Sequence, residues 1–128
     1  GIDGFAINTY FGQDSVILEA GKPVDFFVEV EVKKDAFFEH VMIEVPIPGT
    51  CSYADKRQPY SRVETHREYF KEQVNIFCEK MEAGKYKFVI RLLPRFAGRY
   101  LVNPAQISLM YFPVVNANTS LKHVVVKN

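Results

Sequence analysis

Apolar and polar residues alternate with a period of two along much of the chain, and no other feature of the sequence constrains the fold as strongly. In residues 24–32 every second residue is Val or Phe, and the positions between them include Asp25, Glu29 and Glu31. Successive side chains of a β-strand point to opposite faces, so this stretch predicts a strand with one buried face. The same alternation recurs in residues 41–47, 74–79, 86–92 and 105–111, and again at Val124 and Val126.

Turn-forming residues separate these stretches at regular spacing. Gly adopts backbone angles that other residues resist, and Pro cannot donate to a strand ladder, so both mark chain reversals. Pro46 and Pro48 should therefore lie at a strand end or on a sheet edge. Short strands without helical patterns between them predict an all-β fold, an antiparallel β-sandwich of about eight to nine strands. The turn signals fall at residues 19–23, 48–50, 82–84 and 96–98.

The length and the even composition favour one domain over residues 1–128. A chain of 128 residues can bury one core, and no linker, repeat or low-complexity segment divides it. The first residues, Gly1 to Gly4, carry neither a basic start nor an apolar signal core. Either a targeting segment has been removed or the chain is a piece of a longer protein, and we favour the piece.

Residues 60–72 fit two patterns. Tyr60, Val63 and Phe70 roughly suit one face of a helix, with charges in the gaps. Residues 62–67 also fit an exposed edge strand with Val63 and Thr65 pointing inward. We favour the strand.

Charge and hydropathy exclude two kinds of partner. A formal net charge of +1, with acids interspersed among the bases, gives no basic face for nucleic acid. No apolar run approaches the roughly 20 residues needed to span a bilayer. We therefore expect neither nucleic-acid binding nor a direct membrane span.

The two cysteines, Cys51 and Cys78, permit one disulfide. A bridge would close a loop of about 27 residues, worth roughly 3 kcal/mol in the chain-entropy model. The alternative is two unrelated thiols, with Cys78 buried at an inward-facing strand position. We favour the thiols, because Cys78 fits an inward-facing strand position. Neither cysteine belongs to a CxxC pair.

No group of residues has the spacing of a catalytic or metal site. His40, His66 and His123 lie far apart, each in a strand-like setting. No nucleophile elbow, phosphate-binding glycine loop or calcium loop occurs. A Cys78–His66 pair is conceivable, but a buried thiol is a poor nucleophile. We expect no enzyme activity, no metal and no cofactor.

One remaining sequence feature bears on binding rather than on catalysis, the apolar run Met110-Tyr111-Phe112. Tyr111 falls on the face that reads as inward, while Met110 and Phe112 fall on the opposite face. Large apolar residues on both faces of one strand indicate either a sheet covered on both sides or an interaction patch.

Several short motifs in the chain resemble the C-terminal macroglobulin-like domain of bacterial alpha-2-macroglobulins. That domain has a "leaG-Y" turn, a "G-[RK]-[FY]" turn, a "PPA" step and an "MYxP" segment. Its "vxVEDPLPAG" strand is similar to residues 41–50, although Val45 replaces the usual acid and Asn103 replaces the first Pro of the step. The order and spacing of the motifs, over residues 20 to 126, carry the resemblance. The matching segments here are Met81-Glu82-Ala83-Gly84-Lys85-Tyr86, Gly98-Arg99-Tyr100, Asn103-Pro104-Ala105 and Met110-Tyr111-Phe112-Pro113.

The resemblance implies a module of a protease trap, exported to the periplasm or cell surface, whose parent protein can be lipid-anchored. Its partners would be neighbouring domains of the same polypeptide and, through the full-length protein, target proteases. In this family a thioester forms between a Cys and a Gln three residues later, but Ala54 and Met81 occupy those positions here. The chain thus carries no thioester. Instead the family's "MYxP" tyrosine shields the thioester of a neighbouring domain, which implies this role for Tyr111, with Met110 beside it.

An extracellular β-sandwich that binds carbohydrate or mediates adhesion is the alternative. Such modules present exposed aromatic residues on loops. The candidates here are Tyr53, Tyr60 and Phe96.

Overall fold

The computed structural model describes residues 4–13, 17–57 and 61–128. Within these ranges it contains ten strands. No helix that could cross a membrane occurs in the same ranges. The strands are β1 (Phe5–Phe11), β2 (Ile17–Glu19), β3 (Val24–Pro46), β4 (Cys51–Tyr53), β5 (Glu64–Tyr69), β6 (Gln73–Pro94), β7 (Gly98–Val102), β8 (Gln106–Leu109), β9 (Phe112–Asn118) and β10 (Lys122–Lys127).

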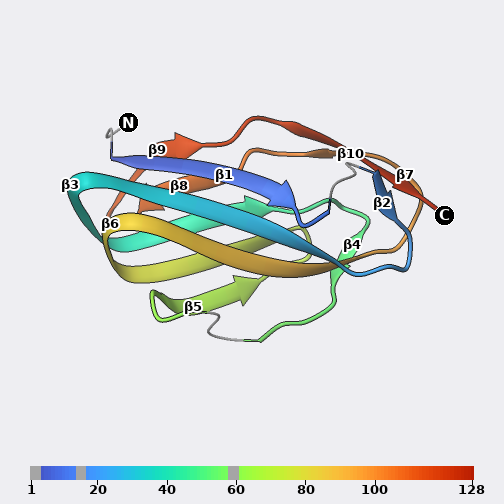
Figure 1. Cartoon of the computed structure of the whole chain (residues 1–128), viewed down its shortest axis with the longest axis horizontal. Helices are drawn as coiled ribbons and strands as arrows, with labels where there is room; N and C mark the ends of the chain where they lie inside the picture. The colour runs from blue at the N-terminus through green and yellow to red at the C-terminus, as the bar shows by residue number, and fades with distance from the viewer. Residues whose placement is uncertain (1–3, 14–16, 58–60) are drawn as a thin grey trace.

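A ribbon of two long strands forms the centre of the fold. β3 has 23 residues and β6 has 22. They pair antiparallel from Val24 opposite Leu92 to Pro46 opposite Gln73. Both strands turn back at the same end of the molecule, so the ribbon folds onto itself and contributes to both layers of the sandwich (Figure 1).

Because the ribbon bends without ending, two predictions from the sequence are wrong. Residues 24–32 and 41–47 belong mostly to one strand, not two, and residues 82–84 lie within β6 rather than in a turn. The pairing shifts register between Val32 and Phe37, and Asp35 and His40 have positive φ angles of 65° and 55°. A register shift sharpens the local twist and bends a strand without ending it. Gly84, with φ of 151°, supplies the extra freedom on β6.

The remaining strands add to the two halves of the ribbon. β1 pairs with the first half of β3 and β8 with its second half, while β4 and β5 pair with opposite ends of β6. β9 extends the sheet beyond β8. A smaller sheet has the order β2-β10-β7, and its β2–β10 pair is parallel. The predicted antiparallel β-sandwich is therefore confirmed, and the described residues form ten strands with one parallel pair.

The core lies between the layers and follows the predicted alternation. The inward positions of residues 24–32, 41–47 and 74–78 are all buried. Burial of this apolar surface is the main term that stabilises the fold. Pro46 is the last residue of β3, as expected. The largest apolar side chains with 1% exposure or less are Phe26, Phe88, Leu18, Ile43, Ile76, Met81, Ile90, Leu92 and Ile107.

The ambiguous segment forms an edge strand, and its predicted inward face is correct only in part. Val63, just before the strand, is half-buried against the core as predicted. β5 pairs with β6 over Glu64–Tyr69, and Tyr60 lies outside the described residues. Thr65 is exposed, whereas Glu64 and Arg67 are buried. A register shift between Glu64 and His66 reverses which residues of the strand point inward. A sequence pattern with a strict period of two cannot predict this reversal.

The buried acid and base of β5 form an ion pair inside the sandwich. Arg67 Nε and Nη2 donate to the two carboxylate oxygens of Glu64 at 2.5 and 2.7 Å. Arg67 Nη1 donates to the backbone oxygen of Val89, on the second half of β6, at 2.7 Å. The pair thereby connects the edge strand β5 to the opposite layer.

Candidate functional site

The turn between β8 and β9 exposes three consecutive large apolar side chains. β8 ends at Leu109 and β9 begins at Phe112. Met110 is 45% exposed, Tyr111 71% and Phe112 70%. The predicted inward orientation of Tyr111 is wrong, because the strand ends two residues earlier and the register shifts again before Leu109. We call Met110, Tyr111 and Phe112 the tip.

The tip is held against the bent part of β3. The Met110 N–H donates to the backbone oxygen of His40 at 2.8 Å. The rings of His40 and Tyr111 meet edge to face, with centroids 4.9 Å apart and planes at 79°. This geometry is a favourable one for two aromatic rings. Tyr111 is therefore positioned by one contact while most of its surface faces solvent.

Exposed apolar residues that lie next to one another differ from scattered ones. Single exposed apolar side chains are common, but a contiguous apolar patch marks a site of association. Two of the three tip residues are aromatic, and aromatic residues are enriched in the buried centres of protein interfaces. The tip therefore has the exposed apolar and aromatic character that is typical of docking surfaces.

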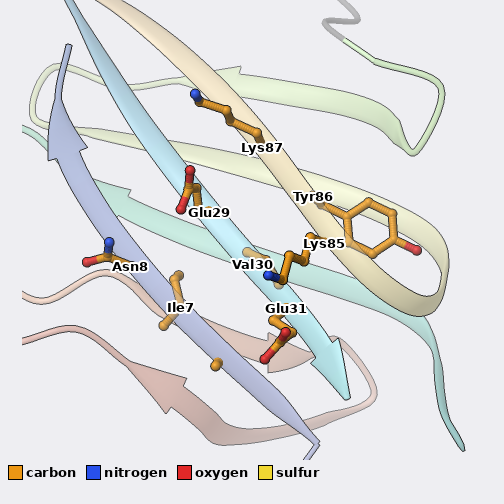
Figure 2. Close-up of a pocket in the computed structure, with 9 residues that line it drawn as sticks. Ile7, Asn8, Glu29, Val30, Glu31, Lys85, Tyr86 and Lys87 are labelled. Carbon is orange, nitrogen blue, oxygen red and sulfur yellow. The ribbon is translucent and has the colours of Figure 1, made fainter. Parts of the chain in front are cut away.

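A hollow of about 480 Å³ lies on the outer face of β1, β3 and β6 (Figure 2). Glu29 pairs in register with Lys87, and Glu31 with Lys85, so each acid lies beside a base. Lys87 Nζ also lies 4.3 Å from the centroid of the Phe27 ring. The charges of these two acids and two bases cancel, and acids paired with bases across neighbouring strands are typical of a solvated sheet face.

Both cysteines are buried and free, so the structure contains no Cys51–Cys78 disulfide. Burial raises the pKa of the Cys51 thiol to about 12. Burial, followed by the nearby Glu64 carboxylate, raises that of Cys78 to about 12, although Arg67 partly opposes this. Thiols with these pKa values stay protonated at neutral pH and are poor nucleophiles.

The histidines do not converge. His40 contacts Tyr111, and His66 stacks on Phe77 with ring centroids 5.5 Å apart. His123, on β10, lies opposite Leu101 of β7. Among the residues that the structure describes, no group of three or more His, Cys, Asp and Glu could hold a metal ion. Of the loop aromatics, Tyr53 and Phe96 line a second hollow, and Tyr60 lies outside the described ranges.

The sequence could not show that His40 supports the tip. His40 occupies an outward position of an alternating strand, which is typical of a solvated side chain. Its role depends on the pairing of Val41 with Leu109, and that register is set by the folded ribbon. A positive φ at a non-glycine residue is the local sign that the position is unusual, and only the structure reveals it.

The antiparallel β-sandwich built around the folded β3–β6 ribbon is a macroglobulin-like fold. The model for the bacterial alpha-2-macroglobulin MG10 domain matches residues 8–113, and the chain belongs to this family. A comparison with curated protein sequences gave no match.

Solved structures agree with this fold. The chain is similar to native alpha-2-macroglobulin from Escherichia coli, with a TM-score of 0.78, 13% identity and coverage of 98% of this chain and 24% of that chain. It is also similar to a tyrosine-to-glycine mutant of Salmonella alpha-2-macroglobulin, with a TM-score of 0.81, 13% identity and coverage of 98% and 9%. A cohesin from Archaeoglobus fulgidus is more distant, with a TM-score of 0.56, 10% identity and coverage of 88% and 86%. The chain thus spans a quarter or less of the alpha-2-macroglobulin structures, and at these identities the likeness concerns the fold.

Proposed function

We propose that residues 1–128 form a non-catalytic C-terminal module of a bacterial alpha-2-macroglobulin-like protease trap. The module docks on a neighbouring domain of the same polypeptide through the tip. The observation that carries this proposal is the exposure of Tyr111, 71%, on a turn that His40 holds in place. Family membership supports the larger protein around it.

Tyr111 also suits the shielding of a thioester in the neighbouring domain. A thioester is an activated acyl group that water and amines attack, so it survives only where both are excluded. A phenol ring covers such a group, and its hydroxyl can donate a hydrogen bond to a nearby polar atom. Cleavage of a bait segment by a protease would then shift the module as a rigid body and expose the electrophile. This action places the parent protein outside the cytoplasm, in the periplasm or at the cell surface.

The full-length protein provides the test. In Tyr111→Ala the thioester should react with methylamine faster than in the parent, measured as the release of free thiol. If the ring contributes only about 1.4 kcal/mol of protection, the rate rises about tenfold. Tyr111→Phe retains the ring and separates its effect from that of the hydroxyl. Unchanged methylamine kinetics in Tyr111→Ala would refute the shielding role.

Two control variants keep this result interpretable. Leu101→Ala removes a large apolar side chain that is 60% exposed, on β7, and should leave the methylamine rate unchanged. The stability of the 128-residue chain distinguishes the tip from the core. Tyr111→Ala should change the free energy of unfolding by no more than about 0.5 kcal/mol, as is usual for surface substitutions. Ile107→Ala, at a fully buried position of β8, should cost about 2–5 kcal/mol.

A further inference from the structure

A second hollow, of about 370 Å³, lies where the β3–β4, β5–β6 and β6–β7 connections meet. β3 and β5 end near it, and β6 both begins and ends near it, away from the bend that supports the tip (Figure 1). Its walls include four aromatic side chains, one of which is Tyr69, and three cationic ones. We call the three cationic residues and the other three aromatic ones the cationic hollow: Tyr53, Phe70, Phe96, Lys56, Lys71 and Arg95.

Hydrogen bonds fasten the three connections to one another. The Tyr53 hydroxyl lies within hydrogen-bond distance of the backbone oxygens of Phe70 and of Gln73, the latter at 3.1 Å. Thr50 Oγ1 accepts from the Phe96 N–H at 2.8 Å and donates to the Phe96 oxygen at 2.9 Å. The Arg95 N–H donates to the Thr50 oxygen at 3.2 Å. The cationic hollow is therefore preformed, which lowers the entropic cost of binding a ligand there.

The charges of the cationic hollow are not balanced from within. No Asp or Glu is found among the described residues that line it. Within the described part of the chain, no ion pair engages Lys56, Lys71 or Arg95. Two acids neighbour its lining residues along the chain, Asp55 next to Lys56 and Glu72 next to Lys71. Asp55 pairs with Arg57 and Arg91, and Glu72 Oε1 would lie 3.1 Å from a Cβ built on Gly49. Because Asp55 is paired with other bases, Glu72 faces three bases and the hollow keeps a net positive charge, in contrast to the balanced hollow of Figure 2.

The cations lie close to the aromatic rings. Lys56 Nζ is 5.6 Å from the centroid of the Tyr53 ring, and the Arg95 guanidinium is 5.9 Å from that of Phe96. A ligand that fits must offer carboxylates to the cations and an apolar group to the rings. Three cations are too few for a nucleic-acid backbone, which is bound by an extended basic face.

We propose that the cationic hollow binds an acidic peptide segment that carries an aromatic side chain between its carboxylates. The aromatic side chain packs on Tyr53, Phe70 and Phe96, and the flanking carboxylates pair with Lys56, Lys71 and Arg95. This inference is independent of the proposed function, because it concerns different residues, away from the tip.

The test titrates the isotope-labelled 128-residue chain with an acetylated and amidated pentapeptide of sequence EDFDE, followed by amide chemical shifts. Saturable shifts should appear in residues 49–53, 69–71 and 95–96. The uncharged peptide QNFNQ should bind about tenfold more weakly or worse, and added salt should weaken EDFDE. Lys71→Glu combined with Arg95→Glu should weaken EDFDE about tenfold or more as well. Lys85→Glu combined with Lys87→Glu, on the balanced hollow, is the matched control and should leave binding unchanged.

Three results would overturn the proposal. The first is the absence of saturable shifts with EDFDE at millimolar concentration. The second is equal binding of EDFDE and QNFNQ, which would reduce the site to an apolar patch. The third is saturable binding of a neutral oligosaccharide at these residues without binding of EDFDE, which would assign the site to carbohydrate.

Discussion

The side chains of Cys51 and Cys78 show how burial fixes the chemistry of a single residue. Both thiols lie in the core, and burial raises the pKa of each to about 12. We predict that iodoacetamide modifies neither thiol in the folded chain at pH 8, and that both react after unfolding in urea. At pH 10 an ordinary thiol is mostly ionised, but only about 1% of a thiol with a pKa of about 12 is, so both cysteines should stay largely unmodified in the folded chain. Mass spectrometry of the alkylated protein measures this.

The same pKa values give a direction for stability. The folded thiols hold their protons up to about pH 12, whereas unfolded thiols, with the ordinary value of 9.0, release them above pH 9. The unfolded state therefore binds fewer protons between these values, and the free energy of unfolding falls as the pH rises from 9 to 12. Replacing both cysteines by Ala should reduce this fall. Rapid alkylation of either thiol in the folded chain would contradict the burial.

Individual core residues were predictable because a strand with one buried face has alternating apolar and polar residues. Val28, Ile43 and Ile90 are apolar positions of this alternation and are fully buried. Thr65 and Tyr111 do not follow it, because a register shift in β5 and the early end of β8 change which residues point inward. Both events depend on the neighbouring strand, so the period of two contains no sign of them.

At the scale of the element, the ion pair of Glu64 and Arg67 determines how β5 is held. Removing one partner leaves a buried charge without its counterion, which costs about 3–5 kcal/mol. We predict that Arg67→Met and Glu64→Gln each lower the free energy of unfolding by about this amount. The double variant Glu64→Leu with Arg67→Met should recover most of the loss, because it removes both charges and keeps apolar volume. Urea denaturation measures all three variants.

The exposed Glu68 of β5 provides the matched control. Glu68→Gln should change the free energy of unfolding by no more than about 0.5 kcal/mol. If Arg67→Met were as mild as Glu68→Gln, the ion pair would not be what anchors β5. A double variant as unstable as the single ones would show instead that the bond to the Val89 oxygen dominates.

The existence and type of most strands could be predicted, but their connections could not. The stretch between Val32 and Phe37 contains two lysines and an aspartate, which resemble a loop, yet β3 continues through it as a bend. The short strands β2 and β4 have three residues each, too few for any periodicity to appear. Their positions follow from the ends of β10 and β6, to which they pair.

At the scale of the whole molecule, the tip and the cationic hollow are separate surfaces of one β-sandwich. The tip rests on the bend of the β3–β6 ribbon, whereas the hollow lies where these strands begin and end (Figure 1). Motif order suggested a role for Tyr111, but it gave no sign of the hollow. The hollow brings together residues 49–53, 69–71 and 95–96, whose proximity depends on β4 and β5 flanking the same long strand.

The size of the chain limits what it can do alone. A trap that encloses a protease needs a wall around it, and this sandwich of 128 residues fills its interior with its own side chains. We predict that the 128-residue chain, in tenfold molar excess, leaves the hydrolysis of azocasein by trypsin unchanged. The full-length parent should reduce that hydrolysis while sparing small peptide substrates, which still diffuse to an enclosed protease. Inhibition of azocasein hydrolysis by the short chain would mean that one of its surfaces blocks the protease directly, and the proposal of a larger protein that entraps proteases would lose its basis.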